Sequence, residues 1–133
     1  MNAYFVLEGL IAFILGVVHS YFGEKYLITP ILHSEHLITA LSGSVGLKKV
    51  ALRVCWHFAT IAMWGAATTL VVLSSLPFNR TSMVVVRIIS LTFVTDTLLV
   101  FLTPGLRLIY LARHFAWVAF LAIAALSWMG TLK

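Results

Sequence analysis

Four long apolar stretches, separated by shorter segments rich in polar and turn residues, make up most of the chain. A helix needs about 20 residues to cross the hydrocarbon core of a bilayer, and each stretch is long enough to do so. The pattern therefore predicts four membrane-spanning helices, near residues 3–23, 50–76, 83–102 and 106–129.

The connections between the last three predicted helices are short. Pro77 and Asn79 follow the second helix, and Pro104 and Gly105 follow the third, which is typical of turns. Consecutive helices joined in this way are expected to be antiparallel. We therefore predict an all-α fold, an integral membrane four-helix bundle in which residues 1–133 form one domain.

The first connection, residues 24–49, is longer and has a mixed composition. Ser34 can cap a short helix over residues 35–41, and Gly43 can end it. We expect this short helix to lie at the membrane interface.

The composition excludes a water-soluble globular domain. Hydrophobic residues make up 62% of the chain and charged residues only 10%, with a mean hydropathy of +1.06, whereas a soluble domain is about 25% charged. The net charge of +5 comes from basic residues scattered at helix ends. This distribution favours membrane lipids rather than nucleic acid as the partner.

The first helix is expected to be retained rather than removed as a signal peptide. Glu8 lies where a signal peptide carries positive charge, and no Ala-x-Ala-like cleavage site follows the apolar stretch.

The basic residues also predict an orientation. One side of the bundle collects more of them (Lys25, Lys48, Lys49, Arg53, Arg107 and Arg113) than the other (Arg80, Arg87 and Lys133). Because cytoplasmic loops are enriched in Lys and Arg, we expect the first side to be cytoplasmic and both termini to be periplasmic.

Ionisable residues at membrane depth are costly and are therefore candidates for function. The ionisable residues that we consider as candidates for a site are His19, Glu24, His57, Asp96 and His114. In an antiparallel bundle all of them belong to the half of the membrane nearest the basic loops.

Small residues accompany this cluster on the first helix. Gly9, Ala12, Gly16, His19 and Gly23 recur at spacings of three and four, so they form one stripe. Such a stripe indicates either close helix packing or a flat ligand held by the histidine against bare backbone.

One hypothesis is that the cluster binds haem b for electron transfer or haem handling. His19 and His57 would be the axial ligands, and Gly16 and Gly23 would give the porphyrin room. Arg53, Lys48 or Lys49 would meet the propionates at the interface.

An alternative is a divalent metal, zinc or iron, in a metal-binding protein or a metalloenzyme. Its ligands would be His19, His57 and His114 with a carboxylate from Glu24 or Asp96. Glu24 lies about 140° around a regular helix from His19, so these two share a metal only if the helix unwinds between them.

The same groups can also be purely structural. His57 can hydrogen-bond Ser20 or a backbone carbonyl, and Asp96 can pair with Arg113. The chain is then a cofactor-free accessory or scaffold subunit of a membrane complex. Its glycine stripe would dock helices of a partner subunit or of a second copy.

Two segments, His19-Ser20-Tyr21-Phe22-Gly23-Glu24 and Arg53-Val54-Cys55-Trp56-His57, carry a resemblance. They resemble small bacterial four-helix inner-membrane proteins with an HS-x-x-GE end to the first helix and a WH pair in the second. The resemblance implies a bacterial inner membrane and points to His19, Glu24 and His57, without implying a particular reaction.

Overall fold

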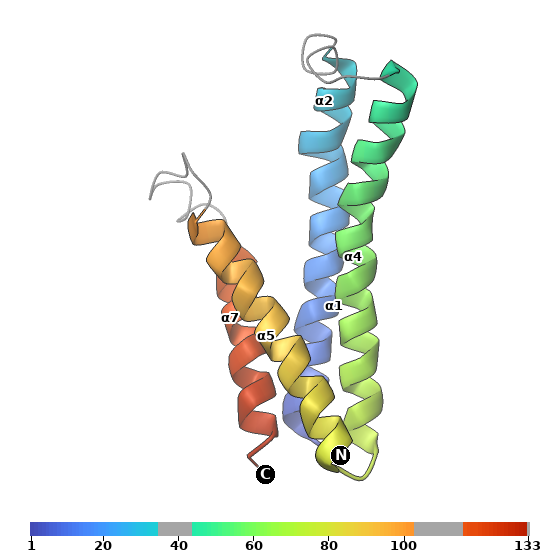
Figure 1. Ribbon diagram of the computed structural model, residues 1–133. Helices are drawn as coiled ribbons and strands as arrows, with labels where there is room; N and C mark the ends of the chain where they lie inside the picture. The colour runs from blue at the N-terminus through green and yellow to red at the C-terminus, as the bar shows by residue number, and fades with distance from the viewer. Residues whose placement is uncertain (35–43, 103–115, 133) are drawn as a thin grey trace.

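A computed structural model describes residues 1–34, 44–102 and 116–132, and the regular elements in these ranges are all helical (Figure 1). They are α1 (Ala3–Gly23), a π-helix η1 (Glu24–Ile28), α2 (Thr29–His33), α4 (Val45–Ser75), α5 (Arg80–Leu102) and α7 (Ala116–Gly130). The all-α prediction is therefore confirmed for these residues. The short helix predicted over 35–41 and the first part of the predicted fourth helix lie outside them.

The first helix continues beyond its predicted end. α1 ends at Gly23, but the backbone runs on through η1 and α2 to His33 without a loop. Pro30 lacks an N–H group, and its ring crowds the carbonyl one turn earlier. The widened π-turn just before Pro30 accommodates this defect within a continuous helix.

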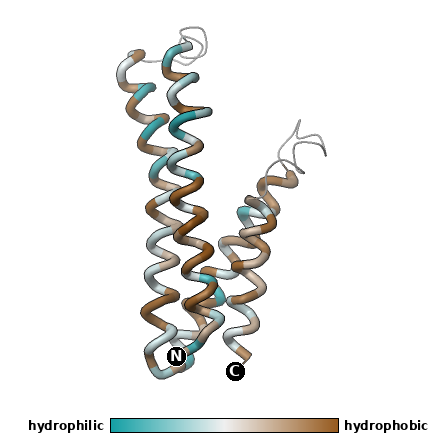
Figure 2. The backbone as a smooth tube through the Cα atoms, turned by 180° about the vertical axis from the view of Figure 1, so that it is seen from behind, coloured by the Kyte–Doolittle hydropathy of each residue, from teal (hydrophilic) through white to brown (hydrophobic). Residues whose placement is uncertain are grey.

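Three helices are long and apolar enough to cross a membrane: Ala3–His33, Val45–Ser75 and Arg80–Leu102. Ala116–Gly130 is a shorter apolar helix. Hydropathy is unevenly distributed along the α1–α4 pair, where the hydrophilic positions gather toward the α2 end (Figure 2). That end holds the candidate site.

The helices form two pairs that diverge from the end where the termini lie (Figure 1). α4 packs along α1, and α5 packs along α7. α1 also contacts α7, whereas α4 and α5 touch each other at few positions. The helix pairs are thus joined mainly through α1.

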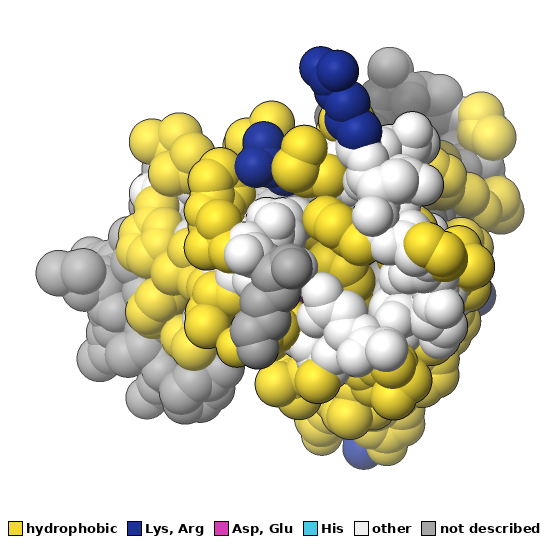
Figure 3. All heavy atoms as spheres, turned by 90° about the horizontal axis from the view of Figure 1, so that it is seen from below, with side chains coloured by type: hydrophobic (Ala, Val, Ile, Leu, Met, Phe, Trp, Pro, Cys, Tyr) yellow, Lys and Arg dark blue, Asp and Glu magenta, His cyan; other side chains and the backbone are white. Residues whose placement is uncertain are grey.

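The exterior is apolar on all the long helices. Large hydrophobic side chains such as Leu10, Ile61, Leu91 and Val118 are exposed. Seen from the end with the termini, apolar side chains form much of the rim, while backbone atoms and side chains that are neither hydrophobic nor charged are visible toward the middle (Figure 3). Such a surface suits a lipid solvent, since lipid tails accept apolar side chains while helices satisfy their own backbone groups.

Asn2 joins three helix ends. Its side-chain oxygen accepts a hydrogen bond from the Tyr4 backbone N–H (3.1 Å) and so caps α1. Its side-chain amide donates to the Gly130 carbonyl of α7 (3.0 Å). Its backbone N–H donates to the Ser74 carbonyl of α4 (2.8 Å). This end of the bundle is therefore held together where the pairs meet.

The glycine stripe of α1 faces α4. A Cβ atom added at Gly9 would lie 2.8 Å from the Val71 side chain, and one at Gly16 would lie 2.6 Å from Trp64 Nε1. A Cβ atom at Gly23 would overlap the Trp56 ring. The stripe therefore serves the close approach of α1 and α4 within the chain.

Both indoles that cover this stripe also donate a hydrogen bond across it. Trp64 Nε1 donates to the Phe13 carbonyl (3.3 Å), and Trp56 Nε1 donates to the His19 carbonyl (3.2 Å). Each tryptophan thus fills the space above a glycine and binds the α1 backbone nearby.

We predict that Gly16→Ala lowers the free energy of unfolding by about 1–3 kcal/mol, the usual cost of overpacking a tight contact. The matched control is Gly65→Ala, because nothing lies within 4 Å of a Cβ added there, and Ala favours a helix by about 1 kcal/mol. Unfolding of the detergent-solubilised protein in SDS measures both. Equal losses in the two variants would contradict the proposed contact.

Candidate functional site at the α2 end of the α1–α4 pair

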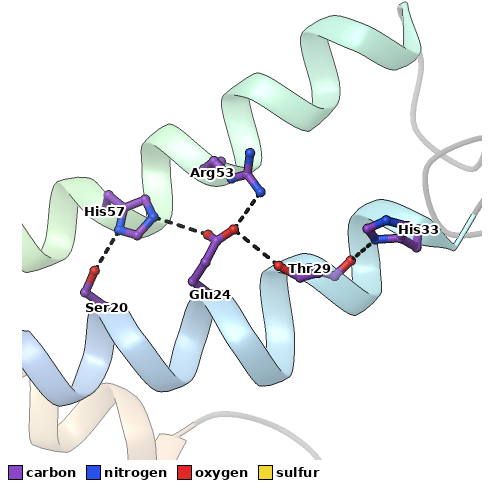
Figure 4. A network of polar contacts seen from close by, with 6 residues as sticks. All are labelled: Ser20, Glu24, Thr29, His33, Arg53 and His57. Carbon is purple, nitrogen blue, oxygen red and sulfur yellow. Dashed lines mark hydrogen bonds and ion pairs between the residues drawn. The ribbon is translucent and has the colours of Figure 1, made fainter.

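Glu24 is the centre of a polar network between the first helix and α4 (Figure 4). Its carboxylate accepts hydrogen bonds from Arg53 Nη2 (2.5 Å) and from Thr29 Oγ1 (3.3 Å). The His57 ring nitrogen Nε2 lies 3.3 Å from its other oxygen. A carboxylate accepts hydrogen bonds only, so the arrangement with ionised Glu24 puts a proton on His57 Nε2.

The second ring nitrogen of His57 also has a partner. Nδ1 lies 3.1 Å from Ser20 Oγ. With the proton on Nε2, Nδ1 accepts the hydrogen bond from the serine hydroxyl. Of the two partners predicted for His57, Ser20 or a backbone carbonyl, the structure has Ser20, and the bond to Glu24 adds an orienting carboxylate.

The local helical geometry explains why these side chains meet. Ser20 and Glu24 are four residues apart on the first helix, as are Arg53 and His57 on α4, so each pair lies on one helix face. Thr29 joins from five residues beyond Glu24, because in the π-turn residues five apart are hydrogen-bonded.

The network opens onto a shallow groove of about 570 Å³ on the side of the α1–α4 pair. Val17, Tyr21, Lys25 and Trp64 line it together with three residues of the network, Ser20, Glu24 and His57. The side chains of Glu24 and His57 are 31% and 34% exposed. A molecule on this surface can therefore reach both the imidazole and the carboxylate.

The groove also carries a cation held over aromatic rings. The Lys25 ammonium group lies 5.8 Å from the centre of the Tyr21 ring and 5.2 Å from that of Tyr26, within the range of cation–π attraction. The wall of the groove beyond the network is thus both aromatic and positively charged.

His19 lies beside this network but makes different contacts. Its ring stacks on Trp56, with centroids 4.3 Å apart and planes at 6°. Its Nε2 atom is buried without a hydrogen-bond partner among the described residues. Gly16 and Gly23, the glycines predicted to give a porphyrin room, face the Trp64 and Trp56 rings. Haem ligation by His19 and His57 stays a prediction.

The metal hypothesis also stays a prediction. Within residues 1–34, 44–102 and 116–132, no three His, Cys, Asp or Glu side chains are grouped closely enough to hold a metal ion. His114, one of the predicted ligands, lies outside these ranges, as does Arg113, the predicted partner of Asp96. Asp96 itself lines a different groove, between α4 and α5.

Glu8 is a buried ionisable residue that the sequence analysis did not include among the candidates. It is fully buried in α1 and accepts a hydrogen bond from Ser127 of α7, which is also fully buried. The available signal was its position four residues before Ala12, within the same apolar stretch and beside the glycine stripe.

No protein-family model matches this chain, and the searches of curated proteins and of solved structures found no match either. The resemblance to small bacterial inner-membrane proteins therefore stays a prediction.

We predict that Glu8→Ala lowers the free energy of unfolding by about 1–3 kcal/mol, because it leaves the buried Ser127 hydroxyl without its acceptor. Glu8→Gln should be close to wild type, since its amide oxygen accepts the same hydrogen bond. SDS unfolding of both variants checks this. If Glu8→Gln were as unstable as Glu8→Ala, the role assigned to the hydrogen bond would be wrong.

Proposed function

We propose that this chain is an antiparallel four-helix protein of the bacterial inner membrane, with the α2 end cytoplasmic and both termini periplasmic. The support is threefold: the three helices long and apolar enough to span a membrane, the apolar exterior, and the distribution of basic residues. Lys25, Lys48, Lys49 and Arg53 lie toward the α2 end, whereas Arg80 begins α5 at the other. Cytoplasmic ends are the ones enriched in such residues.

On this orientation the network lies at the cytoplasmic interface. Glu24 is 21 residues beyond the start of α1, about 32 Å at the α-helical rise. The hydrocarbon core is about 30 Å thick. A molecule dissolved in the membrane can therefore present its polar head to Glu24 while its apolar part stays among the lipid tails.

The proposed ligand is a quinone or quinol, a ring-bearing amphiphile dissolved in the membrane. The observation that carries this proposal is His57, held between Ser20 and Glu24 on the wall of an aromatic groove. Tyr21 and Trp64 offer faces for a ring. The imidazole or the serine hydroxyl can offer a hydrogen bond to a ring oxygen in exchange for one that it makes within the network.

The charges of the network suit proton exchange with such a head group. A quinol gives up protons when it is oxidised, and an imidazole beside a carboxylate is a good proton acceptor. Arg53 stabilises the negative charge of Glu24, so that the carboxylate can in turn stabilise a protonated His57. Oxidation of a quinol to a quinone releases two electrons together with its two protons, so a partner membrane subunit that carries a redox centre would have to accept them. The chain would then be an accessory subunit in electron transfer.

The test is binding of decylubiquinone to the purified protein in lipid nanodiscs, followed by quenching of tryptophan fluorescence. We expect binding to the wild type, and an affinity up to about tenfold lower for His57→Leu, because the loss of one hydrogen bond costs up to about 1.4 kcal/mol. Ser20→Ala should weaken binding less.

Thr68→Val is the matched control for this test, since Thr68 is exposed on α4 outside the groove and its variant should bind like the wild type. Equal affinity of wild type and His57→Leu would contradict the proposal. The network would then serve only to fasten α1 to α4.

A second candidate is haem b, and one observation favours it: the buried Nε2 atom of His19 has no hydrogen-bond partner among the described residues. A ligand on this atom would satisfy it. His57 would have to exchange its hydrogen bond with Ser20 or Glu24 for the metal, and the indole rings above the glycines would have to move.

We expect that, if haem b binds, the purified protein shows a Soret absorption band that His19→Ala abolishes. His57→Ala should also abolish or shift the band, because an axial ligand sets the spectrum. His33→Ala, whose ring bonds the Thr29 carbonyl (2.7 Å), serves as the control. A colourless protein after reconstitution with haem would exclude this candidate.

A further inference from the structure

A second groove, of about 550 Å³, lies between α4 and α5, where the two helix pairs diverge (Figure 1). Its walls are mostly apolar. Ala59, Ala62 and Ala66 line it from α4, and Ile88 and Thr92 are among its residues on α5. The alanines recur at spacings of three and four, so they keep one face of α4 free of bulky side chains. The result is an open apolar slot.

Asp96 is the only charged residue among the described residues that line this slot. Within the described ranges it has no hydrogen-bond or ion-pair partner, in contrast to Glu24, which is paired with Arg53. A charge at membrane depth is costly unless it is compensated. As far as the described residues go, the slot is thus an apolar site with one uncompensated negative charge.

The position of Asp96 sets how a ligand would enter. It lies 16 residues beyond Arg80, about 24 Å along α5, and therefore inside the core but near the cytoplasmic interface on the proposed orientation. The lining residues of α5 run from Val85 to Asp96, a length of about 16 Å. The carboxylate is thus at the end of the slot nearest the basic end of the protein.

We propose that this slot binds a lipophilic cation, with the positive centre against Asp96 and the apolar body along the alanine face of α4. Charge complementarity selects this occupant over a neutral acyl chain, which would leave the carboxylate uncompensated. Binding depends on groups outside the Glu24–His57 network, so this proposal stands or falls independently of the quinone site.

The experiment measures equilibrium binding of radiolabelled tetraphenylphosphonium to the purified full-length protein in nanodiscs. We expect saturable binding by the wild type and at least about tenfold weaker binding by Asp96→Asn, equivalent to about 1.4 kcal/mol. Asp96→Glu should retain most of the affinity. Ala62→Phe should also weaken binding, because its ring would fill the slot while leaving the charge in place.

Two controls show whether binding depends on the charge of the ligand or only on its hydrophobicity. Thr95→Val changes the exposed neighbour of Asp96, which is not among the slot residues, and should bind as the wild type does. The neutral triphenylphosphine oxide should compete poorly. Equal binding by wild type and Asp96→Asn, or equally strong competition by the neutral compound, would overturn the proposal. Elution of each variant as a single species on gel filtration identifies those that are folded.

Discussion

The architecture depends on the close approach of α1 and α4 over glycine. In a bilayer the hydrophobic effect does not drive helices together, so association relies on van der Waals contact and on hydrogen bonds between helices. Gly9, Gly16 and Gly23 are seven residues apart, and they repeat the same contact three times along the pair. The two tryptophans add an indole N–H bond to the opposite backbone beside two of these contacts.

This packing fixes the register in which the polar network forms. With Gly16 under Trp64 and Gly23 under Trp56, Ser20 comes opposite His57 and Glu24 comes opposite Arg53. A slip of one residue along either helix would turn these side chains away from each other, since neighbouring positions differ by about 100° on a helix. The apolar and polar contacts therefore specify one alignment together.

Hydrophobic length and spacing were enough to predict the helical class and the start of the first helix, and the similar depth of His57 and Ser20 made their hydrogen bond one of two alternatives. They could not distinguish a glycine stripe that binds a ligand from one that receives tryptophan, because both need bare backbone. Glu8 was not identified because a carboxylate in an apolar stretch has no partner visible in one sequence; Ser127 lies 119 residues away. The continuation beyond Gly23 was missed because the glycine and the charged residues after it resemble a helix end.

The π-turn over Glu24–Ile28 separates two parts of one long helix. Before the π-turn, in α1, the glycines determine which face lies toward α4. After it, in α2, each residue is rotated relative to a regular helix by the extra residue in the turn. Insertion or deletion of a single residue in the π-turn would consequently rotate the segment from Thr29 to His33 about the helix axis. It would change which side chains this segment presents beside the Glu24 network. Such an adjustment would leave the tryptophan contacts between α1 and α4 as they are, so the facing of Thr29–His33 is set independently of the packing of the two long helices.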